Sequence, residues 1–260
     1  MSSLTYTLSD SATMLRRNLK HALRYPSMTL SVAAMPILML LLFVYAFGNA
    51  LGSGIGPAGG KGDYVDYVAP GIILMAATSG AVSVAVSVCV DMTEGIVNRF
   101  RTLSISRAAV LNGHVWGGVV QTMVSIALVT GVALAIGFRP TATPVEWLAA
   151  IGVLALVVLA LTWLSAAMGL RAKTPEAASN APLPLTFLPF LGNAIVPTDS
   201  MPTGLRWFAE YQPFTPIIDT LRGLLLGTEI GDSALIAVAW CVGLSVVGYF
   251  WARAAYERGQ

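Results

Sequence analysis

Long apolar stretches without a single charged residue alternate along the chain with polar segments. Six such stretches hold about 20 residues or more each, which is enough for a helix to cross roughly 30 Å of hydrocarbon. The segments between them carry all 15 Lys and Arg and all 13 Asp and Glu residues. The pattern predicts an all-α integral membrane protein with six membrane-spanning helices. The charge-free stretches are Tyr25–Gly60, Tyr67–Val90, Ala108–Phe138, Trp147–Leu170, Ala177–Thr198 and Ser233–Ala252.

The composition agrees with this pattern. Of the 260 residues, 56% are hydrophobic and only 11% are charged, whereas a soluble domain carries about 25% charged residues. Six spans leave no room for a second folded unit, so we expect a single transmembrane domain over residues 1–260.

The distribution of basic residues predicts the orientation. If the N-terminus is cytoplasmic, 11 of the 15 Lys and Arg residues lie inside and 4 lie outside. Cytoplasmic loops of membrane proteins carry an excess of Lys and Arg. We therefore predict that both termini are cytoplasmic, in a plasma membrane that we expect to be a bacterial inner membrane.

Three polar segments have amphipathic patterns. Residues 5–25 place Leu8, Leu15 and Leu19 on one helical face beside basic residues, which predicts a helix lying along the inner leaflet. Residues 91–107 form a cytoplasmic loop with an apolar stripe that includes Phe100, and we interpret this stripe as a protein-docking element. Residues 198–231 are too interrupted by charge to span, and they predict outward-facing helices resting in the outer interface.

The outer segment has its own helical signature. Ile217, Leu221, Leu224 and Leu225 form an apolar stripe, and Asp219 and Arg222 form an i, i+3 pair of opposite charge. Residues at this spacing are neighbours on a helix surface.

The second and fifth stretches contain the candidate residues for a transport pathway. Ser79 and Ser83 belong to a hydroxyl stripe in the second stretch, while Phe187, Phe190 and Asn193 recur at three-residue steps in the fifth. Four prolines in the fifth stretch predict a kinked or broken helix. An alternative stays open, in which the serines only pack between helices and the prolines only bend a packed helix. The prolines are Pro182, Pro184, Pro189 and Pro197.

We find no motif for catalysis, a cofactor or a metal. The glycine-rich run around Lys61 does not fit the phosphate-binding pattern, which needs Gly, four residues and then Gly-Lys-Ser/Thr. His114 is the single histidine of the third stretch, and the two cysteines, Cys89 and Cys241, are far apart in the sequence. We therefore expect that the chain is not an enzyme and holds no cofactor.

Two segments resemble the type-2 permease subunits of ABC exporters, the class that contains daunorubicin-resistance-type drug exporters and polysaccharide exporters. The first is EGIVNRFRTLSISR. The second is NAIVPTDSMPTGLRWFAEYQPFTPIIDTLRGLLLG, which begins at Asn193 near the end of the fifth stretch. The first matches the family pattern at Glu94, Gly95, Arg99, Phe100, Leu103, Ile105, Ser106 and Arg107. The second matches at Pro197, Met201, Pro202, Leu205, Arg206, Pro213, Asp219, Arg222 and Gly227.

The resemblance implies a role for each amphipathic segment. Residues 91–107 correspond to a coupling helix that docks on a separate ATP-binding subunit, and residues 5–25 to a connecting helix beside it. Residues 198–231 correspond to re-entrant outer helices, with Pro213, Asp219 and Arg222 in their motif. The implied docking residues are Glu94, Gly95, Arg99, Phe100, Leu103 and Ser106.

The function implied is that of the permease subunit of an ATP-driven exporter for an amphipathic or lipid-like substrate such as a drug, lipid or glycan. Two ATP-binding subunits would bind ATP and Mg and hydrolyse the ATP. A second permease, identical or paralogous, would complete the pathway, and membrane lipids would surround both permeases. No nucleic acid is expected as a partner. The alternatives are an ion-coupled secondary transporter, a channel or an intramembrane enzyme.

Overall fold

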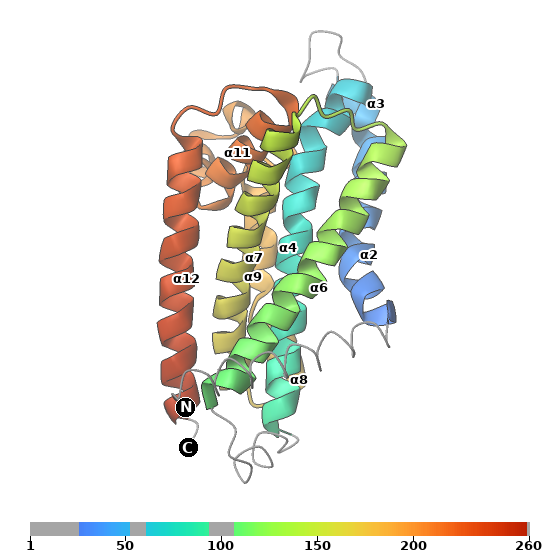
Figure 1. Cartoon of the computed structure of the whole chain (residues 1–260). Helices are drawn as coiled ribbons and strands as arrows, with labels where there is room; N and C mark the ends of the chain where they lie inside the picture. The colour runs from blue at the N-terminus through green and yellow to red at the C-terminus, as the bar shows by residue number, and fades with distance from the viewer. Residues whose placement is uncertain (1–25, 53–60, 94–106, 259–260) are drawn as a thin grey trace.

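The computed structural model describes residues 26–52, 61–93 and 107–258, which form a bundle of long helices (Figure 1). In this part of the chain, five helices are long and apolar enough to cross a membrane. They confirm the all-α membrane fold. The first combines α2 (Pro26–Leu42), a π-helical segment (Phe43–Phe47) and α3 (Gly48–Gly52). The other four are α4 (Lys61–Thr93), α6 (Arg107–Ile136), α7 (Pro144–Arg171) and α12 (Ser233–Arg258).

Helix α4 is the central helix of the bundle. In its most apolar stretch 72% of the residues are buried, against 17% in α12, and it packs against α2, α6, α7 and α8. Small residues allow this close packing. A side chain added at Gly71 would meet the Ala194 backbone at 2.7 Å, and one added at Gly169 of α7 would collide with the Ala85 backbone.

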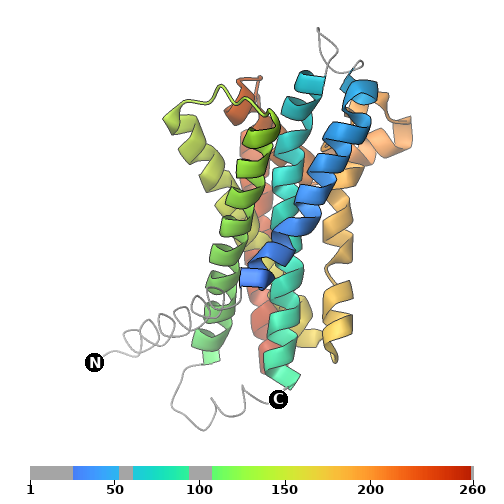
Figure 2. The same cartoon turned by 90° about the vertical axis from the view of Figure 1, so that its right-hand side faces the viewer.

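The fifth predicted span is not one continuous helix. It consists of α8 (Pro175–Asn180), α9 (Leu183–Phe187) and the 3-10 helix η2 (Leu188–Leu191). Proline cannot donate a backbone hydrogen bond, and its ring clashes with the preceding turn. The broken helix is therefore as predicted. These short elements run along the bundle from one end toward the other (Figure 2), but they do not by themselves confirm six spans.

The segment after the fifth stretch folds into η3 (Thr198–Ser200), α10 (Thr203–Tyr211) and α11 (Phe214–Leu226). Helix α11 packs against α4, α7 and α12, and it buries Ile217, Leu221 and Leu225 of the predicted stripe. Gly227 ends it in the left-handed conformation, with φ of 73°. The apolar stripe of α11 thus inserts into the bundle, whereas α10 exposes Trp207 and Tyr211. The place of these outer helices in the membrane interface stays a prediction.

The helix ends form two groups (Figure 1). The start of α2 and the end of α12 lie at the same end, together with the end of α4, the start of α6 and the end of α7. We call this end the α8 end, and the opposite end, which holds α10 and α11, the α11 end. At the α11 end, a capping box between Thr143 and Glu146 begins α7.

Two predicted elements lie outside the described residues. These are the amphipathic helix over 5–25 and most of the docking loop over 91–107. The structure assigns Asp91–Thr93 to the last turn of α4 and Arg107 to the first turn of α6. Helix α4 therefore continues past Asp91 into the segment that was predicted as a loop.

Candidate functional site

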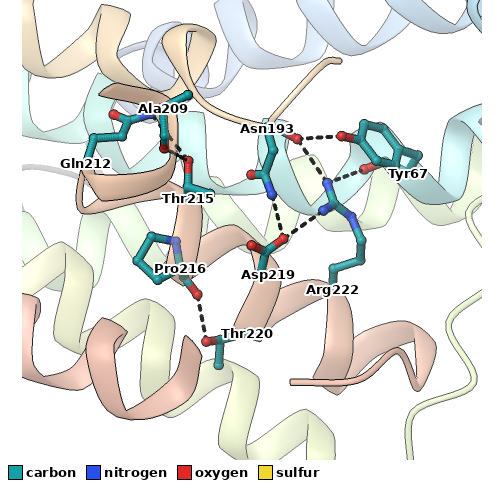
Figure 3. Close-up of polar contacts among 9 residues, drawn as sticks. All are labelled: Tyr67, Asn193, Ala209, Gln212, Thr215, Pro216, Asp219, Thr220 and Arg222. Atoms are coloured by element: carbon teal, nitrogen blue, oxygen red, sulfur yellow. Dashed lines mark hydrogen bonds and ion pairs between the residues drawn. The ribbon is translucent and has the colours of Figure 1, made fainter. Parts of the chain in front are cut away.

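A buried polar cluster joins three separate parts of the chain at the α11 end (Figure 3). Its centre is the guanidinium of Arg222 on α11. Arg222 Nη1 donates to Asp219 Oδ1 at 3.0 Å. Arg222 Nη2 donates to the carbonyl oxygen of Asn193 at 3.0 Å and to that of Tyr67 at 3.3 Å. One arginine therefore links α11 both to α4 and to the chain that follows η2.

Tyr67 and Asn193 close the cluster. The Tyr67 hydroxyl donates to the Asn193 carbonyl at 3.1 Å, and the Arg222 guanidinium lies 4.1 Å from the centre of the Tyr67 ring. Cations are attracted to the face of an aromatic ring at this distance. The Asn193 side-chain amide donates to the same Asp219 oxygen that accepts from Arg222.

The cluster is unevenly exposed to solvent. The Arg222 side chain is 12% exposed and that of Asp219 is 35% exposed. Burial raises the pKa of Asp219, and the neighbouring Arg222 charge and the Asn193 hydrogen bond oppose this rise only in part. Arg222 Nε and Asn193 Oδ1 are buried and have no hydrogen-bond partner among the described residues. The cluster therefore has unused hydrogen-bonding capacity.

A second polar contact fixes the joint between α10 and α11. The Thr215 hydroxyl donates to the Ala209 carbonyl at 2.6 Å, and Gln212 Nε2 donates to Thr215 Oγ1 at 3.5 Å. A side chain added at Gly192 would collide with the Gln212 amide. The end of η2 is thus held against both outer helices.

The structure confirms the predicted contact between Asp219 and Arg222, and it places Pro213 immediately before the first residue of α11. It also brings Asn193 to this pair. Asn193 does not share a helical face with Phe187 and Phe190, because the helix ends at Leu191 before reaching it.

The other predicted pathway residues lie elsewhere. Phe187 is 58% exposed, and its ring centre lies 6.4 Å from that of the partly buried Phe190. Ser79 donates its hydroxyl to the Met75 carbonyl one turn earlier in α4. Ser83 is partly buried. The part of the chain that the structure describes leaves their role in a pathway untested.

Sequence reasoning missed Tyr67. It is 155 residues from Arg222 in the sequence, and it stood only as the first residue of a charge-free stretch. An aromatic residue at such a boundary is common in membrane helices, so nothing in the sequence pointed to this contact. The predicted docking residues from Glu94 to Ser106 lie outside the described residues.

The arrangement is suited to holding helices together rather than to bond chemistry. The cluster contains no histidine or cysteine, and within the described ranges no group of three His, Cys, Asp or Glu residues could hold a metal ion. The cluster locks the short helix α11 onto the central spanning helix α4. Together with the helix bundle, it defines a polytopic helical membrane protein with an inserted outer helix.

Comparison with known proteins gives the family. The sequence model described as ABC-2 type transporter matches residues 11–226. The chain therefore belongs to the ABC-2 type transporter family.

Named relatives cover most of the chain. A daunorubicin resistance ABC transporter permease protein of Streptomyces coeruleorubidus is 27% identical over 245 residues, which are 94% of this chain and 83% of the relative. An inner membrane transport permease of Escherichia coli K12 is 25% identical, over 86% of this chain and 87% of the relative. A probable doxorubicin resistance ABC transporter permease protein of Mycobacterium tuberculosis is 23% identical, over 74% of this chain and 70% of the relative.

Proposed function

We propose that this chain is the permease subunit of an ATP-driven exporter that moves an amphipathic or lipid-like molecule out of the cell. The observation that carries the proposal is family membership over residues 11–226, which include most of the spanning helices and the outer helices. Relatives whose names describe drug-resistance permeases support an exporter with such a substrate.

The chain works with partners in this proposal. Two ATP-binding subunits bind ATP and Mg and hydrolyse the nucleotide, and a second permease completes the pathway. The docking contacts come from the loop between α4 and α6, through the predicted residues Glu94, Gly95, Arg99, Phe100, Leu103 and Ser106. The candidate wall residues of the pathway remain Ser79, Ser83, Phe187, Phe190 and Asn193.

An ion-coupled transporter is the competing function. Ion coupling usually places ionisable side chains inside the bilayer. In the described spanning helices, acidic and basic residues lie only near the helix ends, as Asp63, Asp66 and Asp91 do in α4. This distribution favours an external energy source, which ATP hydrolysis by a partner provides.

The orientation in this proposal places the α8 end in the cytoplasm and the α11 end outside. The positive-inside rule supports it. Cysteines introduced at Gly204 in α10 and at Arg253 in α12 test it, because both positions are exposed. A membrane-impermeant thiol reagent applied to intact cells is expected to label position 204 and not position 253. The opposite labelling would reverse the orientation.

Assembly is tested by co-expression with a candidate ATP-binding subunit from the same organism. We expect the two chains to co-purify and the complex to hydrolyse ATP, while a partner that lacks its nucleotide-binding lysine co-purifies without hydrolysis. The competing function instead predicts transport by the permease alone, driven by an ion gradient.

A further inference from the structure

His114 is not isolated, because it contacts an acidic residue on the neighbouring helix. His114 Nε2 on α6 lies 3.0 Å from Asp91 Oδ2 in the last turn of α4. The two side chains are 9% and 14% exposed. A carboxylate can only accept hydrogen bonds, so Nε2 carries the proton whether the imidazole is neutral or charged.

The pair lies beside a small apolar cluster that is separate from the main core. Asp91 follows Val88 by one helical turn, and His114 lies between Leu111 and Val115. The cluster draws on four spanning helices, and its members are Val84, Val88, Leu111, Val115, Trp163, Ala166, Ala167 and Ala252. Hydrogen bonds are stronger in such surroundings, and an unpaired polar group there is costly.

The last turn of α4 is also held from a second side. Cys89 Sγ contacts the carbonyl oxygen of Ala172, in the chain that follows α7, at 3.5 Å. The hydroxyl of Thr93 donates to the carbonyl of Cys89 at 3.0 Å. The last turn of α4 is therefore held on two sides. Cys89 fixes it to the segment after α7, and Asp91 connects it to α6.

The pair lies on the two helices that flank the segment with the predicted docking residues. Residues 94–106 connect the last residue of α4 to the first residue of α6, and they carry the predicted docking residues. We propose that His114 and Asp91 are a positioning pair, which holds the ends of α4 and α6 in register and thereby couples the docking segment to the spanning helices. Only the coupling role rests on the proposed function, while the register role does not.

The first experiment measures the register of the two helices in the purified permease alone. Spin labels at Thr93 and Trp116, which are both exposed, report the distance between the end of α4 and the start of α6. His114→Leu removes the hydrogen bond, and we expect a broader distance distribution. His114→Gln keeps an N–H donor near the position of Nε2, and we expect it to restore the narrow distribution.

A matched control separates this role from general damage to α6. Thr130 lies on the same helix toward the α11 end, and among the described residues its hydroxyl bonds within α6, to the carbonyl of Ile126. Thr130→Val is expected to leave the distribution unchanged. If His114→Leu cannot be purified, Asp91→Ala removes the same contact from the other helix. Distributions for His114→Leu or Asp91→Ala that match the wild type would overturn the register role.

The second experiment measures coupling in the reconstituted complex. For His114→Leu we expect the number of substrate molecules moved per ATP hydrolysed to fall about fivefold or more, while the KM for ATP stays unchanged because the nucleotide sits on the partner. His114→Gln should recover the wild-type ratio. An unchanged ratio in His114→Leu, or an equal fall in Thr130→Val, would overturn the coupling role. If the wild-type complex shows no ATP-driven transport, the proposed function fails, and the distance measurement still decides the register role.

Discussion

Replacing Arg222 by methionine tests whether the polar cluster locks α11 onto the bundle. Methionine keeps much of the length and apolar volume of arginine but makes none of its hydrogen bonds. The variant loses the bond to Asp219 and those to the carbonyls of Asn193 and Tyr67. It also loses the contact with the Tyr67 ring. We expect the variant to be clearly less stable, with α11 the first element to detach.

The contacts bound the size of the effect. Hydrogen bonds from a charged donor contribute about 1.5–3 kcal/mol each, so a plain sum over three bonds would be about 4.5–9 kcal/mol. Two features reduce this value. The Asn193 carbonyl still accepts from the Tyr67 hydroxyl. Asp219 is exposed enough for water to replace some of the hydrogen bonding that it loses with Arg222. We therefore expect a loss of about 2–4 kcal/mol, or roughly 4–16 °C in Tm.

Arg206 provides the matched control. It also lies on an outer helix and pairs with two carboxylates, Asp199 at 2.8 Å and Glu210 at 2.7 Å, but its side chain is 46% exposed. Exposed ion pairs contribute little to stability, so Arg206→Met should melt close to the wild type.

Both cysteines of the described chain are buried, so a thiol-reactive dye that fluoresces as they become exposed can follow unfolding in detergent. Equal Tm values for Arg222→Met and Arg206→Met would refute the reasoning.

Three further predictions concern packing, docking and protonation. Gly71→Ala should destabilise the protein, because its new methyl group would meet the Ala194 backbone at 2.7 Å, whereas Gly152→Ala has open space and should be neutral or slightly stabilising in the same thermal assay. Phe100→Ala should weaken co-purification with the ATP-binding subunit by about 2 kcal/mol if Phe100 is a binding hot spot, and normal yield together with normal transport would reject the docking prediction. Burial raises the pKa of Asp219, so the folded state binds this proton more tightly than the unfolded state. Asp219→Asn removes this titration. When the pH is lowered from about 7 to about 4, the wild type should therefore gain unfolding free energy relative to Asp219→Asn. A shift in favour of the variant would show that the ion pair with Arg222 outweighs burial.

Patterns local to the sequence predicted much of the structure. Charge-free stretches located five spanning helices, and proline content predicted that the fifth stretch would not be a regular helix. The i, i+3 spacing predicted the ion pair between Asp219 and Arg222. These features depend on residues within a few turns of one another, where hydrophobic period, missing donors and charge spacing act directly.

Features that depend on tertiary packing were not predictable in the same way. The contacts of Tyr67 with Arg222 and of Asp91 with His114 join residues that are far apart along the chain. Helix α4 begins at Lys61, six residues before the charge-free stretch, because charged side chains are tolerated where a spanning helix emerges from the membrane. The burial of α11 also depends on the space left between α4, α7 and α12, which no period in the sequence records.

Transport in inside-out membrane vesicles that contain the permease and its ATP-binding partner tests the central claim most directly. A fluorescent lipid-like cation serves as the probe, and an ionophore collapses the ion gradients. We predict that the probe accumulates inside the vesicles when ATP is added, that the ionophore leaves accumulation unchanged, and that a partner without its nucleotide-binding lysine abolishes it. Accumulation that requires an ion gradient and proceeds without ATP would contradict the account.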